Sequence, residues 1–464
     1  MAITENASLQ IRGEIVREGD PAFDQAFAIW DGGHGQRPAV VARCLDADDV
    51  SAAVRYARDN NLEISVRCGG YNPNNYAVND RGLVIDLRQM DGVKIDPDTR
   101  RARVGGGAIA GDVLTAAGKF GLAPVSGMSY RVGFAGLALS GGEGFFTGKY
   151  GMACDNIVGA TLVTAAGEVI HCSDDERPEL LWGIRGAGPN FGVVTEIEVA
   201  LHALPGSVLC GVLTWMPAPE ELSGFLASLL TAYLATTDGL YPTLLIGRDD
   251  SGAAQISLAI CHIGPPEIAE QEVAQIRALA PAVYDGVERT SYPEAMIALD
   301  ELTKEQFYPS PDVAHSHCWA DHELVSSPER FGEVIASTID RLVTEPDPGM
   351  AMMMFEVLGK KLVNTVGAPA KHRSAPGVMV SAEWADAAQT DRFTTLVKDL
   401  EETLVARGVV SASSGFLHGF SEVTPEMVEE NYGPAAYHRL AKLKAQYDPE
   451  NIFHLNYNIT PAGQ

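Results

Sequence analysis

A pair of adjacent glycines marks the first segment of the chain that could do chemistry. Gly69 and Gly70 follow a β-rich apolar run, and Arg67 and Cys68 stand directly before them. Adjacent glycines let a backbone turn tightly and bring its N–H groups onto an anion. An arginine just ahead of the turn adds a fixed positive charge suited to phosphate. The segment therefore predicts an anion-binding turn, although an R-x-G-G sequence alone is a weak signal.

Three further segments extend this pattern along the chain. A second glycine-dense stretch runs over residues 133–144, and a third covers residues 185–196. The chain closes with Tyr447-Asp448-Pro449 and, a few residues later, Asn456-Tyr457-Asn458. A dinucleotide needs backbone donors around its pyrophosphate and an apolar slot for its rings, and such turns supply both. The alternative is that the glycines only permit tight turns in an unrelated α/β fold.

In this order, the four segments resemble those of the FAD-binding oxidases of the vanillyl-alcohol oxidase and p-cresol methylhydroxylase superfamily, in the berberine-bridge-enzyme-like branch. The resemblance extends over essentially the whole chain. It implies FAD as the cofactor, with the adenine near Val193 and the isoalloxazine ring near Asn456. The residues that it implies around FAD are Arg67, Cys68, Gly69, Gly70, Tyr71, Asn72, Ser129, Gly133, Gly136, Leu137, Gly141, Gly142, Val193, Asn456 and Asn458.

Two positions depart from the family. Members usually carry a histidine, covalently bound to the flavin, where this chain has Tyr71, and a second attachment residue, a cysteine, falls at Ser129. We therefore expect non-covalent FAD, with the phenol of Tyr71 packed against the dimethylbenzene edge of the ring system. Two alternatives stay open, namely an 8α-O-tyrosyl bond and a fold that has lost flavin binding.

A methionine-rich strand is predicted on the substrate side. Met352, Met354, Glu356 and Leu358 alternate and so project to one face. By the resemblance this face borders the substrate, and Glu356 is the only charged residue on it. A lone buried carboxylate has a raised pKa, which suits a general base or a counter-ion for an amine. The alternative is a structural ion pair with a lysine or arginine, and the methionines predict an adaptable apolar pocket.

Histidines supply the remaining candidates. By the resemblance, His418 lies on a second strand at the substrate cavity, where it could transfer a proton; a core histidine held by hydrogen bonds is the alternative. His315 and His317 share a strand face, with Asp321 shortly after, which would permit a metal site. The family uses no metal, and none is predicted.

Composition excludes several classes of protein. The chain has 464 residues, a net charge of −27 and 46% hydrophobic residues, so we expect a soluble protein of two or three packed units. The acidic charge argues against nucleic acid and anionic membranes as partners. No apolar run approaches the ~18 residues of a membrane span, and the N-terminus lacks a signal-peptide core. Seven scattered cysteines favour the reducing cytoplasm.

The predicted fold class is α+β. A helix is expected over residues 46–60, with Asp46 as its N-cap. With the resemblance, residues 1–205 form a FAD-binding domain of the p-cresol methylhydroxylase type, and residues 416–464 return to it. Residues 206–415 form a substrate domain, an antiparallel sheet covered by helices.

The resulting functional hypothesis is a FAD-dependent oxidase. It would remove hydride from a C–H next to an amine nitrogen or a hydroxyl of a small, largely apolar, alkaloid-like or secondary-metabolite substrate, and dioxygen (O2) would reoxidise the flavin. Homodimers are frequent in the family, so a homodimer is expected. The alternatives are a redox-neutral flavin enzyme, such as a cyclase or dehydratase, and a flavin- or small-molecule-binding protein without turnover.

Overall fold

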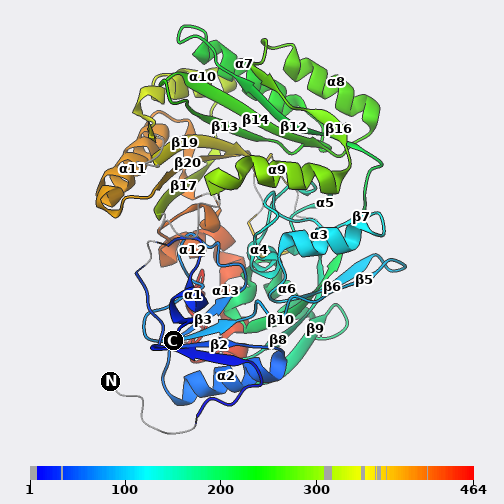
Figure 1. Ribbon diagram of the computed structural model, residues 1–464, viewed down its shortest axis with the longest axis vertical. Helices are drawn as coiled ribbons and strands as arrows, with labels where there is room; N and C mark the ends of the chain where they lie inside the picture. Colours follow the sequence, from blue (N-terminus) through cyan, green and yellow to red (C-terminus); the bar gives the residue numbers. More distant parts are fainter. Residues whose placement is uncertain are drawn as a thin grey trace.

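The computed structural model describes residues 8–32, 35–307, 316–345, 351–360, 362, 367–371, 374–414 and 416–463. Figure 1 shows two parts along the long axis of the molecule: a large sheet with helices on its outer side, and below it two smaller sheets with the chain ends. Mixed helix and sheet of this kind is the α+β arrangement that the sequence predicts. Among the described residues, no helix has both the length and the apolar character needed to cross a membrane.

The lower part begins with a sheet of four strands in the order β1-β2-β4-β3. Strand β2 pairs parallel with β4, and β3 does so on the other side, while β1 runs antiparallel to β2. Buried parallel strands read as continuous apolar runs, as the sequence of β4 does. The strands are β1 (Glu14–Arg17), β2 (Val40–Arg43), β3 (Ile64–Arg67) and β4 (Leu83–Asp86).

Helix α2 (Ala47–Asp59) covers this sheet, and its predicted start is confirmed. The Asp46 side chain accepts hydrogen bonds from the backbone N–H groups of Asp48 and Asp49, which is the N-cap geometry that the sequence predicts. Its apolar face is buried, since Val50, Ala53, Val54 and Ala57 are inaccessible to solvent.

A second, antiparallel sheet of five strands follows, in the order β5-β6-β10-β8-β9. Two helices matter for the site: α4 (Phe134–Ser140) carries much of the second glycine-rich segment, and α6 (Pro178–Ala187) ends within the third. The strands are β5 (Val93–Asp96), β6 (Arg101–Gly105), β8 (Ile157–Val163), β9 (Val169–Ser173) and β10 (Val193–Ala200).

The upper part is an antiparallel sheet of ten strands, whose main order is β15-β12-β14-β13-β19-β20-β17-β21. Helices cover its outer face, and α9 (Tyr292–Phe307) lies on the side that faces the lower part (Figure 1). The central strands are β13 (Thr243–Arg248), β19 (Ala351–Leu358), β20 (Gly377–Trp384) and β17 (Ser316–Leu324). The flanking strands are β12 (Val208–Trp215), β14 (Ala254–His262), β15 (Tyr284–Asp285) and β21 (Val410–Ser414). The outer helices are α7 (Leu222–Ala235), α8 (Pro266–Arg277), α10 (Pro328–Ala336) and α11 (Thr390–Ala406).

Period-two alternation divides the two faces of this sheet. Phe355 and Val357 of β19 are buried in the core under the outer helices, together with Val378 and Val380 of β20. The alternate residues of the same strands therefore face the lower part of the molecule. That inner face is where the predicted substrate residues lie.

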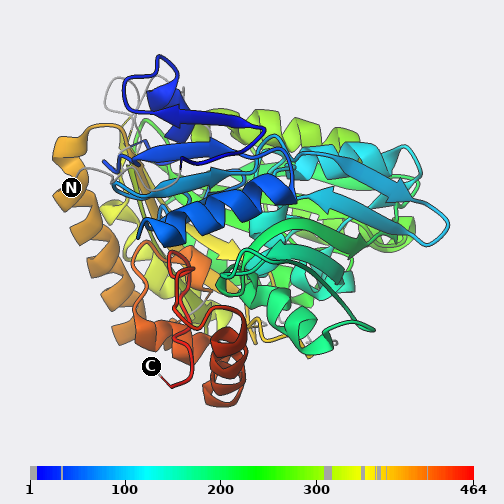
Figure 2. The ribbon, with the colours of Figure 1, turned by 90° about the horizontal axis from the view of Figure 1, so that it is seen from below.

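The C-terminal segment returns to the lower part. After α12 (Pro425–Tyr432) and α13 (Pro434–Tyr447) the tail runs beside the strands of the N-terminal part, as Figure 2 shows from below. Lys444 and Asp448 form a fully buried ion pair at 2.9 Å. Lys444 also donates to the carbonyl of Phe453, and the Asp448 carboxylate accepts from the N–H groups of Ile452 and Phe453, so the pair fixes the turn into the tail.

Candidate active site

The two glycine-rich turns meet backbone to backbone. A Cβ atom at Gly133 would lie 2.5 Å from the backbone nitrogen of Gly69, and a Cβ at Gly69 would in turn strike the backbone of Gly133. No side chain fits at either position without moving the other turn. The turns at 67–72 and 133–142, which are separated in sequence, thus form one wall of a common site.

The side chain of Cys68, from the first turn, packs against the start of α4. The backbone N–H groups of Gly136, Ala135 and Gly69 point to its sulfur. Burial is the largest influence on this thiol and raises its pKa to about 11. The thiol is therefore protonated at neutral pH and acts as a small packed side chain.

Arg67 anchors the first turn from beneath. Its guanidinium is buried and donates to the carbonyl of Ala26 at 2.8 Å and to that of Ala28. Burial lowers its pKa to about 10, which leaves the group charged at neutral pH. These bonds fix the turn against the preceding segment, and a direct contact with phosphate stays a prediction.

Tyr71 joins an aromatic cluster that bridges the two parts of the molecule. Its ring centroid lies 6.3 Å from that of Trp30, which in turn lies 4.4 Å from His317 and 5.3 Å from Trp319, both on β17. Burial raises the pKa of Tyr71 to about 12, so the phenol is neutral at physiological pH. The position where the family has its histidine therefore holds an uncharged ring beside the inner face of the large sheet.

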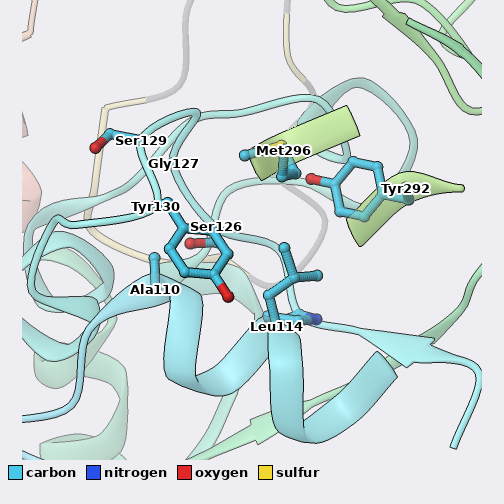
Figure 3. A pocket seen from close by; sticks show the side chains of 9 residues that line it. Ala110, Leu114, Ser126, Gly127, Ser129, Tyr130, Tyr292 and Met296 are labelled. Atoms are coloured by element: carbon cyan, nitrogen blue, oxygen red, sulfur yellow. The ribbon is translucent and has the colours of Figure 1, made fainter. Parts of the chain in front are cut away.

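Ser129 lies on a loop that is held to the upper part. Its hydroxyl accepts a hydrogen bond from the N–H of Arg131, whose side chain forms an ion pair with Asp300 of α9 at 3.0 Å. Figure 3 shows the hydroxyl of Ser129 pointing away from Tyr292 and Met296, which come from α9. The opposite side of the loop borders a small pocket lined by Ala110, Leu114, Pro124, Ser126, Gly127, Ser129, Tyr130, Tyr292 and Met296.

The C-terminal tail completes the lower wall. Asn456 donates to the carbonyls of Pro189 and Phe453, at 3.0 and 2.8 Å. Asn72, next to Tyr71, donates to the hydroxyl of Tyr457 at 3.1 Å. The first turn, the third glycine-rich segment and the tail thus come together as the resemblance implies, although nearly 400 residues separate the first from the last.

The residues in this region fit a FAD molecule. In the part of the chain that the structure describes, the side-chain oxygens of Asn456 and Asn458 are buried and have no hydrogen-bond partner. Gly136 is exposed, and a Cβ there would meet nothing within 4 Å. Buried polar atoms without partners are rare and call for a ligand or water, and the exposed glycine gives that ligand a surface of bare backbone.

The other predicted FAD residues determine the backbone of the second turn and the packing behind it. Gly141 and Gly142 have φ values of +133° and +86°, a region that favours glycine. A Cβ at Gly142 would collide with the side chain of Leu137. Val193 is buried in the core between the sheets, paired with Val163, so its side chain supports the site from within the fold.

On the opposite wall, Glu356 projects from the inner face of β19. Its side chain is 6% exposed and accepts a hydrogen bond from the Ser381 hydroxyl of β20 at 2.8 Å. Burial, followed by the nearby Asp321, raises the pKa of Glu356 to about 7, against the bond from Ser381, which lowers it. No lysine or arginine among the described residues forms an ion pair with it, which argues against the structural ion pair.

The interpretation of Glu356 as a lone carboxylate is wrong. Strand pairing places Glu383 of β20 opposite Met352 and His317, on the same inner face as Glu356, and Asp321 of β17 lies there too. Burial and the charge of Glu356 raise the pKa of Glu383 to about 8. The sequence carries a signal for this, because Ser381 and Glu383 alternate in an otherwise apolar strand, yet only the register shows which face they share.

The prediction that His418 lies on a strand is also wrong. His418 falls in a 3-10 turn, η5 (Leu417–Gly419), and its side chain lies outside the described residues. The Asp321 carboxylate of β17 accepts a hydrogen bond from the N–H of Phe416, just after the end of β21. This bond holds the turn that contains His418 against β17.

The histidines of β17 serve packing and hydrogen bonding. His317 bonds to the carbonyl of Pro73 and faces Asp31 at 3.8 Å, and His322 points to the other face and bonds Glu401. His315 lies outside the described residues. In the described part of the chain, no group of three or more histidine, cysteine or acidic residues could hold a metal ion.

Comparison with known proteins supports FAD as the cofactor. A family described as "FAD binding domain" matches residues 38–173, and one described as "Berberine and berberine like" matches residues 402–460. (R)-6-hydroxynicotine oxidase of Paenarthrobacter nicotinovorans is 49% identical over 98% of both chains. FAD-linked oxidoreductase pgmH of Aspergillus terreus is 27% identical over 97% of this chain and 94% of that protein.

Solved structures agree as well. The crystal structure of 6-hydroxy-D-nicotine oxidase from Arthrobacter nicotinovorans superposes with a TM-score of 0.94 at 48% identity, over 97% of this chain and 98% of that chain. Berberine bridge enzyme from Eschscholzia californica superposes with a TM-score of 0.83 at 19% identity, over 97% of each chain, which supports the fold.

Fold and site together define a FAD-dependent oxidoreductase with a FAD-binding domain of the p-cresol methylhydroxylase type. The chain belongs to the berberine-bridge-enzyme-like family of FAD-linked oxidases. The predicted fold class, FAD cofactor and enzyme class are confirmed.

Two glycine substitutions test the cofactor wall. Gly136→Ala should leave the thermal stability of the FAD-free protein unchanged, because the new methyl enters open space, and should weaken FAD binding by roughly 10–100-fold through overpacking against the ligand. Gly69→Ala should lower both stability and FAD retention, because it separates the two turns. The measurement is FAD affinity from flavin fluorescence alongside thermal melting. If Gly136→Ala binds FAD as tightly as the natural protein does, the cofactor does not lie against Gly136.

Proposed function

We propose that this protein oxidises a small, alkaloid-like amine that carries an aromatic ring, at a C–H next to its basic nitrogen, with FAD bound non-covalently. One observation carries the proposal: Glu356 is a buried carboxylate with a pKa of about 7 on the inner face of the large sheet. The aromatic cluster of Trp30 and Trp319 links this face to the predicted flavin turn at Tyr71. The 49% identical relative is named for a nicotine derivative, which supports an alkaloid-like amine. FAD, when bound, supplies the hydride acceptor, and dioxygen takes up the electrons.

Glu356 is the proton acceptor in this proposal. An amine gives up hydride from carbon readily only when its nitrogen is uncharged, so a group at the site must accept the ammonium proton. A carboxylate with a pKa near 7 is matched to that task at neutral pH. The hydroxyl of Ser381 holds one carboxylate oxygen, which leaves the other for the substrate.

The neighbours of Glu356 set the character of the substrate. Met352, Met354 and Leu358 share its strand face, and Met379 of β20 stands directly across from it. These side chains offer an adaptable apolar surface. Trp30 and Trp319 add aromatic surface on the side toward Tyr71. A flat, largely apolar ring that carries one basic nitrogen fits this combination; His418 stays a candidate for a second proton-transfer group.

The wider organisation follows the family. We infer a FAD-binding domain formed by residues 1–205 and 416–464 and a substrate domain of residues 206–415. The ten-stranded sheet supports this division, because its strands run from Val208 to Ser414. A homodimer, a cytoplasmic location and dioxygen as the second substrate belong to the same proposal.

Glu356→Gln tests the proton acceptor. Once a substrate is found by screening aromatic amines for peroxide formation, this variant should lose roughly 10²–10⁴-fold in kcat/KM and keep its FAD content. In the natural protein, kcat/KM should fall as the pH drops through about 7, because Glu356 must be deprotonated to act. Glu356→Gln should lack this acid limb.

The matched control for that experiment is Ser381→Ala. The hydrogen bond from Ser381 lowers the pKa of Glu356, so without it this pKa should rise. The acid limb should therefore shift to higher pH, with activity retained on the alkaline side. An acid limb that persists in Glu356→Gln would transfer the role of base to another residue.

Tyr71 determines how FAD is held. Acid precipitation of the natural protein should release the yellow cofactor into the supernatant, since neither Tyr71 nor Ser129 matches the attachment residues of the family. Tyr71→His should permit covalent attachment, because the turn at Gly69 and Gly70 is in place, and Tyr71→Phe should release FAD like the natural protein. Flavin that stays with the protein pellet in Tyr71→Phe would contradict a role for this position, and a flavin-bearing peptide containing Tyr71 would contradict non-covalent binding.

A further inference from the structure

Glu383 is a carboxylate of the inner sheet face that the proposed chemistry does not use. Its side chain projects from the inner face of β20, one alternate position beyond Ser381, the residue that holds Glu356. Glu383 is partly accessible, in contrast to the 6% exposure of Glu356. No hydrogen bond or ion pair of Glu383 occurs within the described residues, so its carboxylate is available to a ligand.

Aromatic groups flank this carboxylate. Strand pairing places His317 directly opposite Glu383, and Trp319 opposite Ser381. The ring of Trp30 lies 5.3 Å from that of Trp319 and 4.4 Å from that of His317. The indole N–H of Trp319 is buried without a partner in the described part of the chain, which is a second, independent sign of a ligand.

A carboxylate beside indole rings is the usual protein site for an organic cation. The faces of tryptophan attract an ammonium group, and the attraction grows when water is excluded. A neutral ligand gains no charge attraction from this carboxylate, and when it binds it leaves the carboxylate charge buried and unpaired, which costs free energy. Glu383 therefore discriminates between charged and uncharged ligands of one shape.

We propose that Glu383 is a specificity-determining residue, which holds the ammonium group of the arriving substrate against Trp30 and Trp319 until Glu356 accepts its proton. The proposal rests on the oxidase function inferred above and adds a division of labour between two carboxylates. Binding and proton transfer would otherwise compete for the single free oxygen of Glu356.

The charged groups around Glu383 give this proposal a pH dependence. Glu356 on β19 and Asp321 on β17 share its sheet face, and Asp31 faces His317 from the lower part. Burial lowers the pKa of His317, so this imidazole is neutral at physiological pH. Two buried acids this close ionise one after the other. Glu356 has a pKa of about 7 and Glu383 one of about 8, so affinity for a cation should rise with pH as both protons leave.

The test uses the FAD-loaded protein and two probes of similar size. Benzyltrimethylammonium carries a permanent charge, so any pH dependence of its binding comes from the protein, and benzyl alcohol serves as the uncharged probe. Dissociation constants are measured between pH 6 and pH 9.5 from the perturbation of the flavin absorbance. Glu383→Gln should weaken the cation by on the order of 10–100-fold at high pH and leave benzyl alcohol unchanged.

The pH profile separates this role from a structural one. Glu383→Gln should retain a single titration, which belongs to Glu356 and stays near pH 7, because Glu356 ionises first, while Glu383 still carries its proton. Glu383→Asp should keep both steps and most of the affinity for the cation. The matched control is Glu323→Gln. Glu323 lies on the same sheet face, near the end of β17, where its carboxylate is held by Ser374, so its replacement should change nothing.

Two results would overturn the proposal. One is cation affinity and pH dependence in Glu383→Gln equal to those of the natural protein. The other is an equal loss for both probes in Glu383→Gln and Glu383→Asp, which would reveal a structural role. Binding is measured without turnover, so the two proposals can fail separately. If Glu383→Gln loses affinity for the cationic probe alone, and the natural protein oxidises no amine, the cation-binding role of Glu383 is supported and the oxidase proposal is refuted.

Discussion

The contact between two backbone turns, at Gly69 and Gly133, determines the shape of the cofactor side of this molecule. Because neither position has a side chain, strand β3 can deliver its turn against the start of α4. The N–H groups of that helix start then converge on Cys68, and Gly136 presents bare backbone to the open side. The C-terminal tail closes the same wall through Asn72 and Tyr457. A cofactor with a phosphate chain and a flat ring is what such a wall can hold.

The opposite wall depends on how the upper sheet is fastened to the lower part. Arg131 and Asp300 form an ion pair between the loop of Ser129 and α9, and Tyr241 donates to Glu143 at 2.6 Å. The aromatic contacts of Trp30 with His317 and Trp319 add a third connection. These contacts hold the carboxylates of the inner sheet face over the predicted flavin position, so the chemistry depends on the interface as much as on either part.

Several backbone features that the sequence predicts are present in the structure, because their signals are local. Glycine pairs, the Asp46 cap and the Asn456-Tyr457-Asn458 element each depend on a few adjacent residues, and each lies where these residues place it. The substrate side is different. Glu383, Ser381, Trp319 and His317 come together through the register of β17, β20 and β19, which no single strand reveals. The alternation of β19 predicts the face of Glu356 but not its neighbours, and the place of His418 depends on a tertiary bond to Asp321.

In the proposed mechanism, carboxylates of the inner sheet face and FAD act together on an amine in a redox reaction. The most direct test mixes the FAD-loaded protein with candidate aromatic amines under anaerobic conditions and follows the flavin absorbance. The account predicts that a substrate bleaches the oxidised flavin, and that admitted air restores the yellow colour with formation of hydrogen peroxide. Product that forms without oxygen while the flavin stays oxidised would contradict the account and establish a redox-neutral enzyme.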